Sequence, residues 1–298
     1  MHIGIDLGGT KTEIIAMGKG NESLLRRRID TPQGDYQGAI RIITDLIKGV
    51  EKDLGHTGTI GIATPGAISP ASGLIKNANS TCLNGKPFDR DLAEALGREI
   101  RIANDADCFT LSEAVDGAAA GATTVFGVII GTGTGGGVVI NQRLLSGPNA
   151  IAGEWGHNPL PWPRAEELPG HPCYCGQHAC IETFLSGPGL SRHHTARFGQ
   201  TLTAKEIVEL SEQGNEDAEN SLLQYEDQMA RALASIINVI DPHVIVLGGG
   251  LSNIDRLYRN VPLLWGKYVF SDRVDTRLVK AKHGDSSGVR GAAWLHSE

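Results

Sequence analysis

The chain has 298 residues, a formal net charge of −7 and 40% hydrophobic residues, so it is long enough for about two domains and apolar enough for a sizeable core. The acidic balance argues against nucleic-acid binding, because the only basic cluster is Arg26–Arg28, which we interpret as a solvated strand edge. The chain has no apolar run that could span a bilayer, no signal-peptide pattern and only five cysteines, so we expect a cytoplasmic protein without membrane or nucleic-acid partners or a disulfide scaffold.

The N-terminus reads as a strand, a glycine turn and a second strand. Ile3–Asp6 and Thr12–Met17 are apolar and flank the turn Leu7–Thr10. A Walker A phosphate loop is excluded, because its lysine must follow a glycine and Lys11 follows a threonine.

Two amphipathic helices, expected over 34–54 and 88–96, are explained by packing alone, and 61–69 reads as a strand and a turn. The segment 99–105 then predicts a strand that ends at Asn104 and Asp105, followed by a helix. A carboxylate at that junction suits a general base, since the helix dipole favours its ionised form. A helix-capping aspartate would occupy the same place, and the pattern does not separate the two roles.

Residues 125–140, "VFGVIIGTGTGGGVVI", contain the glycine spacing of a dinucleotide-binding turn. That fold requires a helix after the glycines, whereas 137–140 is β-branched and reads as another strand. The segment therefore predicts a hairpin, and a Rossmann fold is rejected.

The two glycine hairpins share one pattern when Gly9-Thr10 is aligned with Gly133-Thr134, which indicates an internal duplication into two similar α/β halves. Two such hairpins facing across a cleft could bind a polyphosphate through backbone N–H groups and threonine hydroxyls. Two ordinary tight hairpins are the alternative. Because a carboxylate beside phosphate needs a cation, Asp6 at the end of the first strand predicts a Mg²⁺ site.

A cluster of thiols follows in the second half. Cys173, Cys175 and Cys180 lie within eight residues, with His157 upstream. Three thiolates and an imidazole make a closed, structural Zn²⁺ site, whereas buried thiols or a redox pair are the alternatives. Cys82 and Cys108 stand apart and suit ordinary burial.

A third glycine cluster comes near the end of the chain. A helix is expected over 218–241, ended by Pro242, and a buried strand then leads into Gly248, Gly249 and Gly250. A turn at that end of a strand is where open α/β sheets bind ligands, but a tight strand–helix connection would look the same. A terminal helix follows.

These motifs together resemble the ROK family of repressors and sugar kinases. The matching segments are Asp6–Lys11, Asn104-Asp105, Gly131–Gly133, Glu154–His157, the cysteine cluster and Gly248–Gly250, and they run in family order along essentially the whole chain. The resemblance implies an α/β, actin-like ATPase (ribonuclease H-like) fold with two α/β domains around a cleft. It also implies a smaller N-terminal domain of residues 1–116 plus 285–298, a larger domain of residues 117–284 that carries the zinc site, and a homodimer.

The resemblance also implies roles for individual residues. Asp105 becomes the catalytic base, and ATP with Mg²⁺ is expected at Asp6, Gly8, Gly9, Thr10, Lys11, Gly131, Thr132, Gly133, Gly248, Gly249 and Gly250. For Lys11, an exposed strand lysine is the alternative. Sugar hydroxyls are expected at Asn79, Asn104, Asp105, Glu154, His157 and Glu182, with His157 also binding zinc.

Two positions depart from the family pattern. Asp107 replaces the usual asparagine and either caps the helix or raises the pKa of Asp105. Ala179 replaces a glycine, which strains the turn if positive φ is required there. His171 and His178 lie near the cluster, although the family does not use these positions as ligands.

The expected activity is ATP-dependent phosphorylation of a hexose at its 6-hydroxyl. Within the family, "GEWGHNPLPW" and "KNANSTCLNG" most resemble the bacterial fructokinases, so D-fructose is the first expectation. Glucose, mannose or an N-acetylhexosamine is the alternative, because one substituent changes selectivity only modestly in many pockets. A sugar-responsive repressor is a different class, which we do not expect because only two residues precede the first strand and leave no room for a helix-turn-helix. A non-enzymatic sugar sensor would be expected to lose the base or the glycine turns, and both are present.

Overall fold

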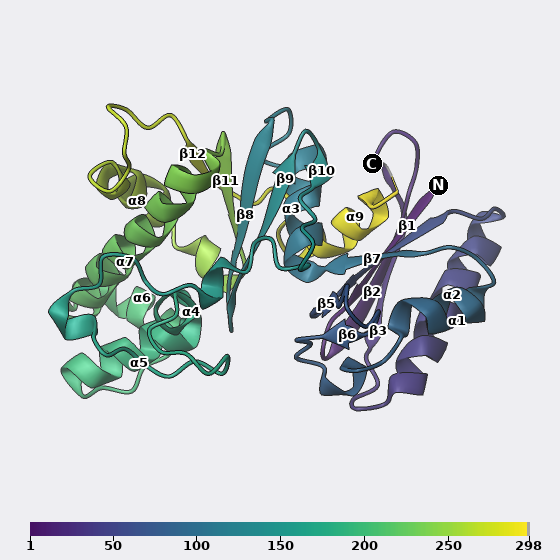
Figure 1. Ribbon diagram of the computed structural model, residues 1–298, viewed down its shortest axis with the longest axis horizontal. Coiled ribbons are helices and arrows are strands. Elements are labelled where there is room, and N and C mark those ends of the chain that lie inside the picture. The colour runs from purple at the N-terminus through teal and green to yellow at the C-terminus, as the bar shows by residue number, and fades with distance from the viewer. Residues whose placement is uncertain (297–298) are drawn as a thin grey trace. The chain divides into compact units, whose positions relative to one another are not determined.

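The computed structural model describes residues 1–296. The chain divides into two compact units (Figure 1). Unit 1 comprises Met1–Gly121, Gly137–Ala152 and the C-terminal segment from Lys282, and unit 2 comprises Ala122–Gly136 and Gly153–Ala281. The domain boundaries expected from the sequence, at residues 116 and 285, stay a prediction, and residues 297 and 298 of the predicted N-terminal domain lie outside the described residues.

The first half of the chain forms a five-stranded sheet with the strand order β3-β2-β1-β4-β7. Its strands and helices are β1 (His2–Leu7), β2 (Lys11–Met17), β3 (Ser23–Asp30), α1 (Tyr36–Leu54), β4 (Thr59–Thr64), α2 (Phe88–Leu96), β7 (Arg101–Asn104) and α3 (Asp105–Val115). A small separate pair, β5 (Ala67–Ile68) and β6 (Ile75–Lys76), and the 3₁₀ turn η1 (Thr81–Leu83) lie between β4 and α2.

The second half forms another five-stranded sheet, with the order β10-β9-β8-β11-β12. Its elements are β8 (Thr124–Ile130), β9 (Thr134–Ile140), β10 (Arg143–Leu144), η2 (Trp155–His157), η3 (Ala165–Glu167), α4 (Glu182–Leu185), α5 (Gly187–Phe198), α6 (Ala204–Glu212), α7 (Glu216–Ile240), β11 (Val244–Gly248), η4 (Gly250–Asn253), α8 (Leu257–Trp265), β12 (Arg277–Lys280), η5 (Gly284–Ser286) and α9 (Ser287–Trp294). Residues 1–296 contain no helix with the length and apolar character needed to cross a bilayer.

The two sheets correspond strand for strand. In each, the first two strands are neighbours joined by a glycine turn, the third extends the sheet beyond the second, and the fourth runs parallel to the first. A helix follows the last strand of each sheet, α3 after β7 and α9 after β12. The predicted internal duplication and both predicted hairpins are therefore confirmed.

Helix α9 packs on the first sheet, although it follows the second one in the chain. It lies so close to the strands that a Cβ on Gly4 of β1 would come within 2.1 Å of the Val289 carbonyl oxygen, and one on Gly61 of β4 within 1.8 Å of that of Ala292. Gly4 and Gly61 are paired across the parallel strands β1 and β4, so together they form a flat seat for the helix. Part of the glycine content of this chain thus serves helix packing rather than ligand binding.

The core of unit 1 is built from isoleucines on both sides of the helix–sheet contact. The isoleucines of β1 and β4 are fully buried in this cluster, and helix α1 presents Ile40, Ile43, Ile47 and Val50 at steps of three and four residues. Asp35 caps α1 by accepting a hydrogen bond from the Gly38 N–H, and Gly55 ends it in the left-handed conformation. The helix predicted over 34–54 is confirmed, and it begins at Tyr36 and ends at Leu54.

Candidate functional site

Asp6 is the last polar residue of β1, and it lines a cavity of about 330 Å³ in unit 1. The cavity is also lined by Gly8, Gly9, Gln33, Asn79 and Asp105. Asp6 thus shares one cavity with the first glycine turn and with two of the residues expected to bind sugar, which lie far apart in the sequence.

The environment of Asp6 opposes its ionisation. Burial first, and then the nearby carboxylates of Asp105 and Glu13, raise the pKa of Asp6 to about 7, although Arg28 acts in the opposite direction. The carboxylate also packs against the start of α9, where a Cβ on Gly288 would come within 2.7 Å of Asp6 Oδ2. A buried carboxylate with acidic neighbours fits a divalent cation, because a positive charge would remove the cost of ionising it.

Asp105 is the first residue of α3, directly after β7, as the sequence predicts. The N–H of Ala106 donates to Oδ1 of the capping residue Asn104 and to Oδ1 of Asp105, at 2.8 Å in each case. Asn104 therefore does the capping, while the exposed Asp105 side chain lines the cavity. A carboxylate that lines a cavity can act as a general base, and the role of Asp105 as the base stays a prediction.

The first glycine turn is closed by a hydrogen bond of 3.0 Å from the Gly8 N–H to the Lys11 carbonyl oxygen. Lys11 starts β2 and forms an exposed ion pair with Asp30 on β3. Its ammonium group is therefore held beside a surface carboxylate, and its contact with phosphate stays a prediction.

The second glycine turn connects β8 and β9 in unit 2. The Gly131 N–H donates to the Gly133 carbonyl oxygen (2.9 Å), and the Gly131 carbonyl accepts from the Gly187 N–H at the start of α5 (2.8 Å). The N–H of Thr134 donates to Glu182 Oε2 at 2.9 Å. Glu182, expected as a sugar ligand, is thus attached to the glycine turn that is expected to bind phosphate.

The third glycine cluster forms the connection between β11 and η4. Gly249 has φ 81°, and a Cβ there would come within 2.5 Å of the Ile130 carbonyl oxygen at the end of β8. Such close packing is a structural reason for this glycine. Nucleotide contact of Gly248, Gly249 and Gly250 stays a prediction.

The four predicted metal ligands meet at one place in unit 2. One ligand atom each from His157, Cys173, Cys175 and Cys180 lies within 4.8 Å of all the others. His157 Nδ1 lies 3.5 Å from Cys173 Sγ, and Cys175 Sγ lies 3.6 Å from Cys180 Sγ. Thiolates about 2.3 Å from a tetrahedral Zn²⁺ would be separated by similar distances, so the donor set fits zinc.

The surroundings of Cys180 and Cys175 shift the pKa values of the two thiols in opposite directions. Burial raises the pKa of Cys180 to about 12, whereas a hydrogen bond from the backbone of Gln177 lowers the pKa of the exposed Cys175. Binding of a cation would keep all of them ionised. Ala179 has φ 56°, so the turn does require positive φ, and alanine occupies a conformation that glycine adopts more readily.

His157 presents Nδ1 to the cysteines and Nε2 to a neighbour that the sequence reading missed. Nε2 lies 2.9 Å from the hydroxyl of Tyr174, the residue between the first two cysteines, and the two rings meet edge to face. The predicted contact of this nitrogen with a sugar hydroxyl would therefore compete with Tyr174. Glu154 precedes η2 and is exposed.

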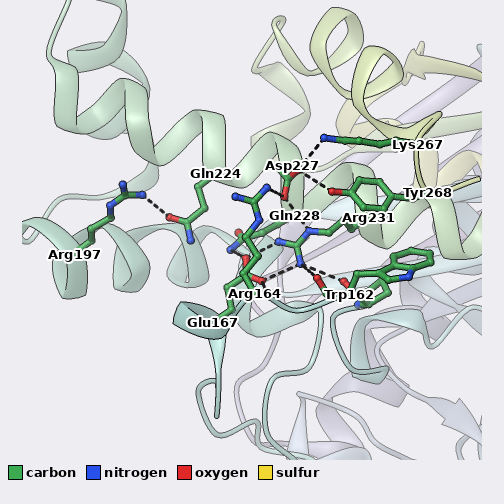
Figure 2. Close-up of polar contacts among 11 residues, drawn as sticks. Trp162, Arg164, Glu167, Arg197, Gln224, Asp227, Gln228, Arg231, Lys267 and Tyr268 are labelled. Atoms are coloured by element: carbon green, nitrogen blue, oxygen red, sulfur yellow. Dashed lines mark hydrogen bonds and ion pairs between the residues drawn. The ribbon is translucent and has the colours of Figure 1, made fainter.

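A buried ionic network anchors the segment that carries the metal ligands (Figure 2). Arg231 of α7 donates to both oxygens of Glu167, at 2.9 and 2.5 Å, to the carbonyl oxygen of Trp162 at 2.9 Å and to Asp227 at 2.9 Å. Burial opposes the ionisation of Glu167, but hydrogen bonds from Arg231, Arg164 and Gln228 outweigh it and lower its pKa. No sequence motif pointed to the contacts of Arg231 with Glu167 and Trp162, because these partners lie more than sixty residues away, whereas Asp227 lies one turn away on α7.

Comparison with known proteins places these features in context. A model of the ROK family matches residues 2–298. The chain is 41% identical over 300 residues to an N-acetyl-D-glucosamine kinase of Haemophilus influenzae and 39% identical to one of Photobacterium profundum, with 99% of each chain covered. Among solved structures, a ROK hexokinase from Thermus thermophilus superimposes with a TM-score of 0.87 at 31% identity, covering 99% of this chain and 97% of that one. The fold is the actin-like ATPase fold, as expected.

Proposed function

Because the chain belongs to the ROK family and is an ATP-dependent hexose kinase, we propose that its sugar is N-acetyl-D-glucosamine and its product the 6-phosphate. The observation that carries this proposal is the full-length similarity to N-acetyl-D-glucosamine kinases at 41% and 39% identity. The fructose expected first from two short motifs has no such support, whereas the N-acetylhexosamine alternative has.

Asp105 is proposed as the general base. Its carboxylate lines the unit 1 cavity, while the neighbouring Asn104 takes over the capping of α3. It accepts the proton of the sugar 6-hydroxyl as that oxygen forms a bond to the γ-phosphorus. The bond between the γ-phosphorus and the β,γ-bridging oxygen breaks, and ADP leaves with the electron pair.

The remaining residues hold the reactants. Asn79, Asn104, Glu154, His157 and Glu182 are proposed to bind sugar hydroxyls, as paired donors and acceptors suit a polyol. Backbone N–H groups of the glycine turns are proposed to bind the phosphates of ATP, at Gly8–Lys11, Gly131–Gly133 and Gly248–Gly250.

Two metal ions complete the proposal. Asp6 would hold Mg²⁺, which neutralises phosphate charge when bound, and His157 with the three cysteines would hold a structural Zn²⁺. The zinc ligands come from η2 and from the loop before α4, so zinc would order the segment that leads to Glu182. A homodimer and the two predicted domains belong to the same proposal.

The test is ADP release by the purified, zinc-loaded protein with N-acetyl-D-glucosamine, fructose, glucose and mannose, with the products identified by ³¹P NMR. We expect the highest kcat/KM with N-acetyl-D-glucosamine and a 6-phosphate product. A higher kcat/KM with fructose would overturn the sugar assignment, and binding of sugars without turnover would identify a sensor instead.

A further inference from the structure

The first glycine turn is held from one side by the short segment that follows β3. Three consecutive carbonyl oxygens of the turn each accept a hydrogen bond from this segment. The Gly8 carbonyl accepts from the Thr31 hydroxyl at 2.9 Å, that of Gly9 from the Gln33 side-chain amide, and that of Thr10 from the Thr31 backbone N–H at 2.9 Å. The segment therefore occupies every carbonyl between Gly8 and Thr10.

This arrangement also decides where the N–H groups of the turn point. In a trans peptide, the C=O of one residue and the N–H of the next point in opposite directions. With the Gly8 and Gly9 carbonyls directed at residues 31–33, the N–H groups of Gly9 and Thr10 are directed to the other side of the turn. A glycine peptide could otherwise rotate and present its carbonyl, which would repel an anion.

The backbone of the segment is conformationally restricted where it makes these contacts. Thr31 precedes Pro32, which restricts Thr31 to extended backbone, and its hydroxyl lies 2.8 Å from that of Thr12 on β2. Since Thr31 uses its only hydroxyl proton for the Gly8 carbonyl, Thr12 is the donor in this pair. Thr12 is fully buried, so the chain of hydroxyls starts from a fixed point in the sheet.

We propose that Thr31 and Gln33 are positioning residues for phosphate binding, which act by fixing the peptide planes of Gly8, Gly9 and Thr10. The proposal rests on the proposed nucleotide site, because it assigns these residues a role through the glycine turn. Gln33 lines the same cavity as Asp6 and Asp105. Its side chain is exposed, and its amide donates a hydrogen bond to the Gly9 carbonyl oxygen.

The test compares the affinities of ADP and AMP, measured by isothermal titration calorimetry, in Thr31→Val and Gln33→Leu variants. Each substitution keeps the approximate volume and removes one donor. We expect each variant to bind ADP about three- to tenfold more weakly, the effect of one lost hydrogen bond, and to bind AMP nearly as wild type. KM for ATP should rise while KM for the sugar stays unchanged, and Thr31→Ser should restore ADP affinity.

Matched controls separate this role from a merely structural one. Gln37→Leu changes an exposed glutamine on α1, and Thr59→Val changes a threonine at the opposite end of the sheet, where β4 begins. Both should bind ADP like wild type. Unchanged ADP affinity in Thr31→Val and Gln33→Leu, or equal losses for ADP and AMP, would overturn the proposal. A wild-type protein that binds ADP but phosphorylates no hexose would refute the proposed function. The ADP and AMP affinities of the two variants would still test the role of Thr31 and Gln33.

Discussion

Glu182 Oε2 accepts the backbone N–H of Thr134 at 2.9 Å, which attaches the second glycine turn to the residue that follows the cysteine cluster by two positions. A Cβ on Gly133 would come within 2.7 Å of the same oxygen, so the turn and the carboxylate are in direct contact. One side chain thus has two expected tasks, to hold the phosphate turn and to bind a sugar hydroxyl.

Substitution of Glu182 should separate these two tasks. In Glu182→Gln the amide oxygen can still accept from Thr134, so we expect KM for the sugar to rise about tenfold while KM for ATP stays near wild type. In Glu182→Ala both interactions are lost, and both KM values should rise. Steady-state kinetics with each substrate varied would check this, and equal effects of the two substitutions on KM for ATP would contradict it.

The assignment of Asp105 as the base is tested by comparison with its neighbour on α3. Asp105→Asn should fold, keep its metal content and lose about 10²- to 10⁴-fold in kcat, the usual effect of removing a general base. Asp107→Asn is the matched control, since it removes one carboxylate from the same helix, and it should keep kcat within a few-fold. A shift of the acidic limb of the pH–rate profile in Asp107→Asn would show that Asp107 raises the pKa of Asp105. Equal losses in both variants would count against the assignment.

Asp6 makes stability depend on pH in a direction that can be measured. Its pKa is about 7 in the folded protein, against 3.8 for an ordinary aspartate, so the folded state binds an extra proton between these pH values. Stability is therefore lost as pH rises from 4 to 7. Between pH 5 and 7 the loss is about 2 to 3 kcal/mol, at about 1.4 kcal/mol per pH unit.

Asp6→Asn should abolish this loss. In the absence of divalent cations, we expect the variant to be more stable than wild type at pH 8 and to have a smaller advantage at pH 5, with kinase activity lost at both. Thermal unfolding followed by circular dichroism in EDTA would measure it. The same stability difference at both pH values would show that Asp6 ionises normally.

Metal content tests the cysteine cluster. Elemental analysis should find about one zinc per chain in the wild type, and Cys180→Ser should lose it, since a three-ligand site binds structural zinc poorly. Cys82→Ser and Cys108→Ser are the matched controls, because both cysteines lie outside the cluster, and they should retain zinc. Wild-type protein that refolds without bound metal, even in excess zinc, would contradict the site.

The buried network of Arg231 predicts a large cost for its removal. Arg231→Met leaves Glu167 and Asp227 in the protein interior without their main partner, so the free energy of unfolding should fall by about 3–5 kcal/mol. Arg197→Met is the control, because Arg197 is exposed and makes only surface contacts among those described, a hydrogen bond of 3.2 Å to Gln224 (Figure 2) and a cation–π contact 5.1 Å from the Phe198 ring centre. This variant should change stability by about 1 kcal/mol or less. Urea unfolding of both variants checks the comparison, and similar effects would show that the network adds little.

The order of local elements was readable from residue patterns. Apolar periodicity and glycine turns predicted both hairpins, the helices after residues 34, 88 and 218, and the strand that leads into Asp105. The spacing of the cysteines predicted the four ligands that the fold brings together. These features depend on neighbours in the chain, so short stretches of sequence determine them.

Tertiary structure decided the contacts between distant segments. Four contacts have no signal in the local sequence, because each joins residues that only folding brings together. They are the contacts of Thr31 and Gln33 with the first glycine turn, Gly288 with Asp6, Glu182 with the second glycine turn, and Arg231 with Glu167. Two short motifs favoured fructose, which the full-length similarity to N-acetyl-D-glucosamine kinases does not support. Selectivity depends on the shape of a pocket rather than on a stretch of sequence. Sequence alone thus determined the secondary-structure elements and the candidate site residues. Tertiary packing determined which of these side chains are held in place, which way they point and how readily they ionise.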